Sequence, residues 1–177
     1  MPRYAVLLRG VNLGGHKKVS MADLRELLSG LGYRDVRTLL NSGNVVLAAE
    51  ADPAAVEREV EGAIEGKLGM SVRCLARTGD ELRAVIEGNP LAEVATNGSR
   101  MMVHFLFAAP DPALLSEHNP VDLAPTEIGL GDRVVYQWCP DGLMAAPPVG
   151  PFVEKHLGVT VTARNSNTVT KLRELST

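Results

Sequence analysis

Residues 34–49, RDVRTLLNSGNVVLAA, decide the fold of this chain. The stretch contains two β-rich runs, 34–41 and 45–49, which are joined by Asn41-Ser42-Gly43-Asn44. Asn and Gly readily adopt the positive φ angles that tight hairpin turns require. The stretch therefore predicts an antiparallel hairpin in which Asn and Gly supply those angles.

Helical patterns flank this hairpin on both sides. Before it, Tyr4–Leu8 predicts a buried strand, and Ser20 is a suitable N-cap for a helix with leucines at helical spacing. After it, Pro53 opens a second helix, and residues 71–77 return as a strand. The order is β-α-β-β-α-β, that of the split-βαβ or ferredoxin-like unit. In this unit the first and third strands are antiparallel neighbours, so the end of the first strand lies beside the start of the third.

The rest of the chain repeats that order without a residue-level repeat. The predicted elements are a helix over 79–87, a strand from Met101, a helix at Asp111-Pro112, strands over 126–130 and 133–139, a helix from Pro151, a strand over 159–163 and a helix over 167–176. We therefore predict an α+β protein of two tandem ferredoxin-like (βαββαβ) units with antiparallel sheets and a C-terminal helix. The predicted units are residues 1–78 and 101–177, joined by a connecting helix and loop over 79–100.

The composition is that of a soluble protein. The chain has 177 residues, of which 45% are hydrophobic. No apolar run approaches the roughly 20 residues that span a bilayer, and the start lacks a signal-peptide pattern. These features predict a cytoplasmic protein without a membrane segment. Cys74 and Cys139 stand alone in apolar runs, which predicts buried free thiols. The four histidines show no metal-ligand spacing, so we predict no metal site and no cofactor.

Charge is spread unevenly over a chain of net charge −3. Residues 1–44 carry seven Lys and Arg against three Asp and Glu, and residues 159–177 carry three against one. The negative total argues against a general nucleic-acid coat, and one Trp, three Tyr and three Phe supply a poor stacking platform. The basic first segment could still follow backbone phosphates, so nucleic acid stays a weakly supported alternative.

The loop RGVNLGGHKK, residues 9–18, invites comparison with a phosphate-binding loop. His16 follows Gly15 where that motif needs Lys, and no hydroxyl follows, which excludes nucleotide hydrolysis of that type. Gly14 and Gly15 nevertheless give a ligand access to backbone N–H groups, and Arg9 and Lys17 supply positive charge. The loop is either an anion site or a surface loop whose glycines serve turns.

The hairpin turn adds a second polar cluster. If the predicted topology holds, Ser42 and Asn44 lie beside Arg9, where a hydroxyl and a carboxamide could orient a ligand. Asn12 adds another carboxamide from the first loop. The need for a tight turn would by itself also explain the residues Asn41-Ser42-Gly43-Asn44.

A third cluster, TARNSNT, occupies residues 162–168. Either Asn165 or Asn167 can cap the final helix, and the presence of the other asparagine then needs a different explanation. Arg164 could bind a carboxylate or phosphate as a fork, or pair with a neighbouring Asp or Glu.

Three stretches together carry a family resemblance: LRGVNLGG at 8–15, SGN at 42–44 and RNSNTVTKL at 164–172. In this order they resemble the bacterial family called domain of unknown function 1697, over nearly the whole chain. The resemblance implies an α+β protein of two related halves, and it implies no activity.

These features predict a pocket for a small anionic, phosphate-bearing ligand at the end of the first sheet. The predicted ligand-binding residues are Arg9, Asn12, Gly14, Gly15, Lys17, Ser42, Asn44, Arg164, Asn165 and Asn167. Asp23 and Glu26 are the only acidic residues between Arg9 and Arg34, and both belong to the predicted helix, so acid–base catalysis at the loop needs a carboxylate from elsewhere, and enzymatic activity stays open. A nucleic-acid-binding module and an oligomerising scaffold are the alternatives. The sequence leaves open the oligomeric state and whether Arg164 reaches the first site.

Overall fold

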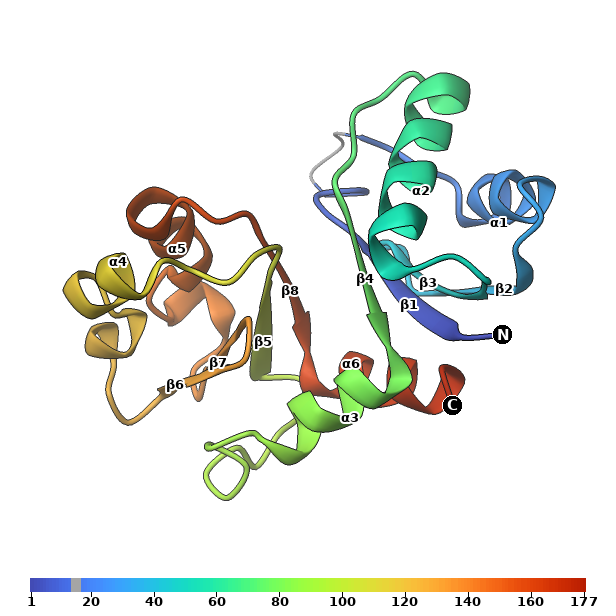
Figure 1. Cartoon of the computed structure of the whole chain (residues 1–177). Helices are drawn as coiled ribbons and strands as arrows, with labels where there is room; N and C mark the ends of the chain where they lie inside the picture. The colour runs from blue at the N-terminus through green and yellow to red at the C-terminus, as the bar shows by residue number, and fades with distance from the viewer. Residues whose placement is uncertain (14–16) are drawn as a thin grey trace. The chain divides into compact units, whose positions relative to one another are not determined.

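The computed structural model describes residues 1–13 and 17–177 (Figure 1). They form two compact units: the first unit is Met1–Leu82 with Leu172–Thr177, and the second unit is Arg83–Lys171. Each unit contains one four-stranded antiparallel sheet, and the described chain has six α-helices. The predicted α+β class is confirmed.

The first sheet has the strand order β2-β3-β1-β4. Its strands are β1 (Arg3–Leu8), β2 (Arg34–Leu39), β3 (Asn44–Ala48) and β4 (Cys74–Thr78). The central strand β1 runs antiparallel to β3, with Leu7 opposite Asn44. The predicted pairing is confirmed, and it places the loop after β1 beside the turn before β3.

Two helices, α1 (Met21–Gly30) and α2 (Pro53–Leu68), cover one face of this sheet. Ser20 caps α1 by accepting a hydrogen bond from the Asp23 N–H at 3.3 Å, and Asp52 caps α2 in the same way at Ala55, 2.8 Å. Gly69, at φ 68°, ends α2 in the left-handed region. Apolar residues of both helices and of alternate strand positions form one core: Tyr4, Val6, Leu8, Leu24, Leu28, Val45, Leu47, Val56, Val60 and Ile64.

The hairpin between β2 and β3 differs from the prediction in one respect. Its positive φ angles belong to Leu40 (61°) and Gly43 (91°) and not to Asn41 or Asn44, so the assignment to Asn was wrong. Leu40 is 59% exposed, so in this conformation its side chain lies outside the core. Gly43 is required for space as well, since an added Cβ would lie 2.5 Å from Cγ2 of Val11.

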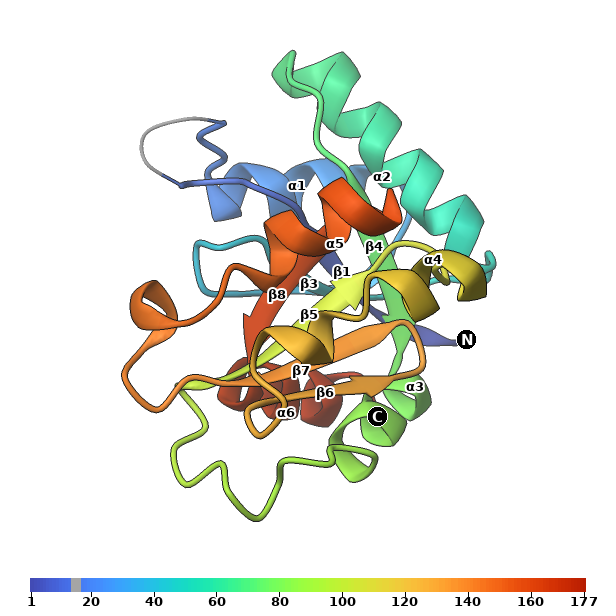
Figure 2. The same ribbon diagram turned by 90° about the vertical axis from the view of Figure 1, so that its left-hand side faces the viewer.

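The second sheet has the strand order β6-β7-β5-β8 (Figure 2). Its strands are β5 (Met101–Leu106), β6 (Ile128–Gly131), β7 (Val134–Trp138) and β8 (Val161–Asn165). The core on one face is shared with α4 (Pro112–Glu117), the 3₁₀ helix η1 (Pro120–Leu123) and α5 (Val149–Leu157). A second 3₁₀ helix, η2 (Leu143–Ala145), precedes α5, which begins at Val149 and not at the predicted Pro151.

A helix follows the last strand of each sheet. Thr78 and Glu81 form a reciprocal capping box, with both hydrogen bonds at 3.1 Å, at the start of α3 (Gly79–Glu87). Asn165 caps α6 (Ser166–Leu175) by accepting the Thr168 N–H at 2.9 Å. Of the two asparagines predicted as alternative caps for the final helix, Asn165 is the cap.

Candidate functional site

Hydrogen bonds join the two polar loops at one end of the first sheet. The Leu8 N–H donates to the Gly43 carbonyl at 2.8 Å, and Nδ2 of Asn12 donates to the Asn41 carbonyl at 2.6 Å. The loop after β1 and the hairpin turn are therefore direct neighbours, as the topology predicted.

Asn12 holds the first loop in shape. Its Nδ2 also donates to the Val19 carbonyl at 3.0 Å, and its Oδ1 accepts the Val19 N–H at 2.8 Å. Asn12 lies at φ 56°, a left-handed conformation that Asn tolerates better than most residues. The carboxamide is thus committed to backbone groups on both sides of the loop.

Asn44 stabilises the hairpin turn through hydrogen bonds of its side chain. It is fully buried, and its Nδ2 donates to the Leu39 carbonyl at 2.9 Å and to Oγ of Ser42 at 3.0 Å. These contacts satisfy a buried carboxamide that would otherwise cost about 1–3 kcal/mol. They also fix the half-buried Ser42 beside the loop after β1.

Cationic residues from three parts of the chain meet at these loops. The backbone N–H of the half-buried Arg9 donates to the Arg73 carbonyl at 2.9 Å, and Nζ of Lys17 donates to the Ser71 carbonyl at 2.7 Å. The Arg73 side chain is 58% exposed, and its Nε lies 3.5 Å from Oε2 of Glu61. Sequence reasoning missed Arg73, because it considered only the pairing of the first and third strands; the pairing of β1 with β4 is what brings the residues that enter β4 to this end of the sheet.

The remaining predicted residues lie outside the described residues or belong to the second unit. Gly14 and Gly15 lie outside the described residues. Arg164 belongs to the second unit, is 7% exposed, and donates to Oγ1 of Thr162 and to its neighbour's carbonyl, both at 2.8 Å. Burial lowers the pKa of Arg164 to about 10. Asn165 is the cap of α6, and the exposed Asn167 lies in the first turn of that helix.

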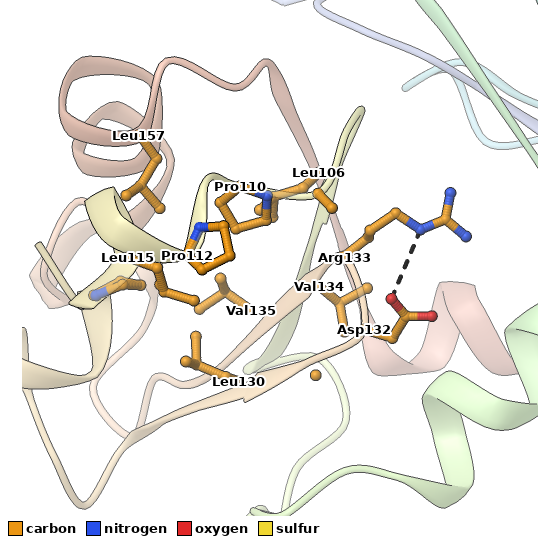
Figure 3. Close-up of a pocket in the computed structure, with 13 residues that line it drawn as sticks. Leu106, Pro110, Pro112, Leu115, Leu130, Asp132, Arg133, Val134, Val135 and Leu157 are labelled. Carbon is orange, nitrogen blue, oxygen red and sulfur yellow. Dashed lines mark ion pairs between the residues drawn. The ribbon is translucent and has the colours of Figure 1, made fainter.

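The second unit contains an apolar cavity of about 220 Å³ between the sheet and α4 (Figure 3). Leucine, valine and proline side chains gather around it: Leu106, Pro112, Leu115, Leu130, Val135 and Leu157. Asp132 and Arg133, whose charged groups are 3.9 Å apart, border the cavity, and their charged ends point away from the apolar cluster. Among the described wall residues, no charged group therefore points into the cavity to bind an ionic ligand.

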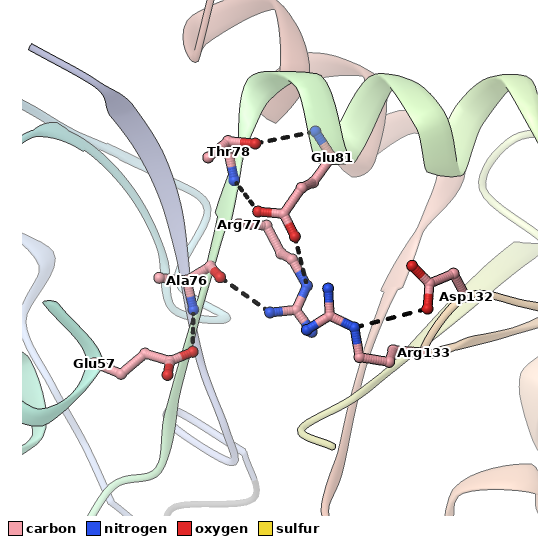
Figure 4. A network of polar contacts seen from close by, with 7 residues as sticks. All are labelled: Glu57, Ala76, Arg77, Thr78, Glu81, Asp132 and Arg133. Carbon is pink, nitrogen blue, oxygen red and sulfur yellow. Dashed lines mark hydrogen bonds and ion pairs between the residues drawn. The ribbon is translucent and has the colours of Figure 1, made fainter. Parts of the chain in front are cut away.

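Each sheet has a buried arginine at the same register. Arg77 of β4 lies opposite Ala5 of β1, and Arg164 of β8 lies opposite Val103 of β5. Arg77 is 6% exposed, donates to the Ala76 carbonyl at 3.0 Å, and has its Nε 3.9 Å from Oε2 of Glu81 (Figure 4). The two arginines are a residue-level correspondence between the units, which the sequence alone did not reveal.

Both thiols are free and buried, as predicted. Cys74 is 2% exposed and Cys139 is fully buried. Burial raises the pKa of each thiol, so neither supplies a thiolate at neutral pH.

Residues 1–13 and 17–177 contain neither a cluster of metal-ligating side chains nor a helix suited to span a membrane. Within these ranges no three His, Cys, Asp or Glu side chains gather to hold a metal ion. No helix in the same ranges has the length and apolar character to cross a bilayer.

Comparison with known proteins shows the fold and the family. The structure of conserved bacterial protein SP0830 from Streptococcus pneumoniae is similar, with a TM-score of 0.66 and 22% sequence identity over 99% of this chain and 98% of that chain. A search of curated proteins gives no match. The family model described as "Protein of unknown function (DUF1697)" matches residues 1–136. The chain therefore belongs to the DUF1697 family, as its three motifs indicated.

Proposed function

We propose that this DUF1697 protein binds a small phosphate-bearing anion at the end of its first sheet. The observation that carries the proposal is the convergence of Arg9, Lys17 and Arg73, which the hydrogen bonds from Arg9 and Lys17 of the loop 9–18 to the carbonyls of Arg73 and Ser71 bring to one place. The exposed Lys18 lies next to Lys17 in the chain and adds a fourth positive charge. Such a group of cations favours an anion with several oxygens.

The proposal gives the polar residues two kinds of role. Arg9 and Arg73 supply guanidinium groups for charge-assisted hydrogen bonds to the anion, and Lys17 supplies positive charge. Gly14 and Gly15 give access to backbone N–H groups, and Ser42 offers its hydroxyl. Asn12 and Asn44 act through the backbone that they hold. Arg164, Asn165 and Asn167, in the second unit, are proposed as additional ligand contacts.

A titration with tripolyphosphate tests the proposal. Arg9→Ala is expected to weaken binding by about tenfold to a hundredfold, since a charge-assisted hydrogen bond contributes roughly 1.5–3 kcal/mol. Arg3→Ala is the matched control, because Arg3 lies at the other end of β1 and forms an exposed ion pair with Asp35 at 3.4 Å. Equal affinities of the two variants would contradict the proposed site.

Salt dependence separates the alternatives. A nucleic-acid-binding module should lose affinity for an oligonucleotide steeply between 50 and 200 mM salt, by about 10³-fold or more if it contacts several phosphates. A small-ligand pocket should lose much less for tripolyphosphate. A protein that binds neither probe would support the scaffold alternative, in which the polar clusters are only caps and turns.

We also infer that the chain consists of two ferredoxin-like repeats, residues 1–78 and 101–177, which residues 79–100 connect; the last residues of the second repeat, Leu172–Thr177, belong to the compact first unit. The support is the β-α-β-β-α-β element order and the matching strand orders of the two sheets. A cytoplasmic location remains part of this proposal. The boundaries can be tested by limited proteolysis, which should cut first between Glu87 and Met101.

A further inference from the structure

The two sheets differ at two equivalent positions. His104 of β5 occupies the register position of Val6 in β1, since each lies opposite a valine on one neighbouring strand and an alanine on the other. Gln137 of β7 likewise occupies the position of Leu47 in β3. Val6 and Leu47 belong to the apolar core of the first unit. The second unit thus carries a polar pair where the first has two aliphatic side chains.

This polar pair has a defined hydrogen-bond direction. Nε2 of Gln137 donates to the Pro147 carbonyl at 2.8 Å, which leaves Oε1 facing Nε2 of His104 at 2.8 Å. An amide oxygen only accepts, so Nε2 of His104 carries the hydrogen. Burial lowers the pKa of His104, which keeps the ring neutral. Nδ1 is then an acceptor, and within the described part of the chain it has no hydrogen-bond partner.

His104 is one of the residues that line a pocket of about 380 Å³. The other described wall residues are uncharged, and most are apolar, including Leu143, Met144, Pro147, Pro148, Val149 and Val161. Met144 is 99% exposed, while His104 is 4% exposed and Gln137 fully buried. The pocket therefore combines apolar walls with one buried acceptor that lacks a partner.

The helix lengths explain why a pocket forms here. Helices α2 and α5 both end at a left-handed glycine, Gly69 at φ 68° and Gly158 at φ 67°, but α2 has 16 residues and α5 has nine. Val56, in the first half of α2, shares the core cluster of Val6 and Leu47. In the second unit the connection over 139–148 contains only the short 3₁₀ helix η2 before α5 begins, so no α-helical turns correspond to the start of α2.

We propose that this pocket binds a small uncharged ring molecule whose N–H or O–H group donates to Nδ1 of His104. The uncharged walls disfavour an ionised ligand, and an acceptor without a partner favours a ligand that brings a donor. Because His104 is 4% exposed, wall side chains such as Leu143 must move aside as the ring enters. The thioether of Met144 is then available to pack against an aromatic edge.

Indole and N-methylindole test the proposal, because they share a ring and differ in the N–H group. Both are titrated into the full chain, and amide and imidazole nitrogen resonances are recorded by NMR. Indole is expected to shift the amides of Leu143, Gly150 and Ala163 and the Nδ1 resonance of His104. N-methylindole is expected to bind about two- to tenfold more weakly, the range of one neutral hydrogen bond, and to leave Nδ1 unchanged.

A double variant, His104→Val with Gln137→Leu, gives the second sheet the residues of the first. It should lose the preference for indole, whereas Arg3→Ala, which removes an exposed ion pair in the first unit, should keep it. Equal affinity of the wild-type protein for both probes, or no shift at the wall amides, would overturn the proposal, as would a preference that persists in the double variant. If the double variant does not fold, the comparison of indole with N-methylindole on the wild-type chain still tests the proposal.

Discussion

Gly43→Ala is expected to destabilise the first unit through two separate effects. Gly43 lies at φ 91°, a conformation that costs an L-residue roughly 1–2 kcal/mol. An added Cβ would also lie 2.5 Å from Cγ2 of Val11 and 2.8 Å from Cβ of Leu8. Both contacts are too close, and Val11 and Leu8 are fully buried, so neither can move freely away.

The second effect can be given a magnitude of its own. Overpacking of a well-packed interior costs typically about 1–3 kcal/mol. The two effects together amount to about 2–5 kcal/mol. For a chain of this length each kcal/mol lowers Tm by about 2–4 °C, which predicts a decrease of about 4–20 °C.

Gly32→Ala isolates the steric part of this loss. Gly32 has a closely similar φ of 95°, but nothing lies within 4 Å of its added Cβ. Urea denaturation of both variants should therefore show Gly43→Ala less stable than Gly32→Ala by about 1–3 kcal/mol. Equal losses would refute the close approach of the hairpin turn to the loop after β1, and with it the geometry of the proposed anion site.

Two further predictions concern buried titratable groups. Because the pKa of His104 is lowered in the folded state, the unfolded chain binds the extra proton below about pH 6.5, and stability should fall as the pH decreases, by at most about 1.4 kcal/mol per pH unit. Urea denaturation between pH 7.5 and 5.5 should show this slope in the wild type and a shallower one in His104→Gln, and parallel slopes would contradict it. Cys74 and Cys139 should resist Ellman's reagent in the native protein and react after unfolding, so rapid native reaction of both would show that they are not buried.

The element order could be predicted because it rests on local signals. Ser20 and Pro53 act within one turn of the helices they start, and each has the predicted position. The hairpin was predictable for the same reason. The positive φ of Gly43 was predicted as well, whereas that of Leu40 was not. The closeness of Gly43 to Val11 could not be predicted, because it depends on a loop that lies far away in the sequence.

The candidate anion site could be predicted only in part. The pairing of β1 with β3 follows from the topology and correctly brings the loop of Arg9 to the hairpin turn. The structural role of the two carboxamides could not be predicted. Asn12 and Asn44 form hydrogen bonds with backbone groups, and no rule of residue spacing identifies those groups. Arg73 was not predicted because an exposed arginine just before a strand does not interrupt the pattern of apolar residues.

His104 and Gln137 show where strand patterns stop being informative. In a strand that is buried on both faces, one polar residue does not disturb the apolar run, so MMVHFL and VVYQW predict strands as well as a wholly apolar run would. Only the register shows that the two polar side chains meet on one face, at positions that are aliphatic in the first sheet. A buried polar pair with an acceptor left without a partner lowers stability unless something compensates it. A ligand that donates to Nδ1 of His104 would provide that compensation, so the position at which the two units diverge is the position at which a function specific to the second unit is expected.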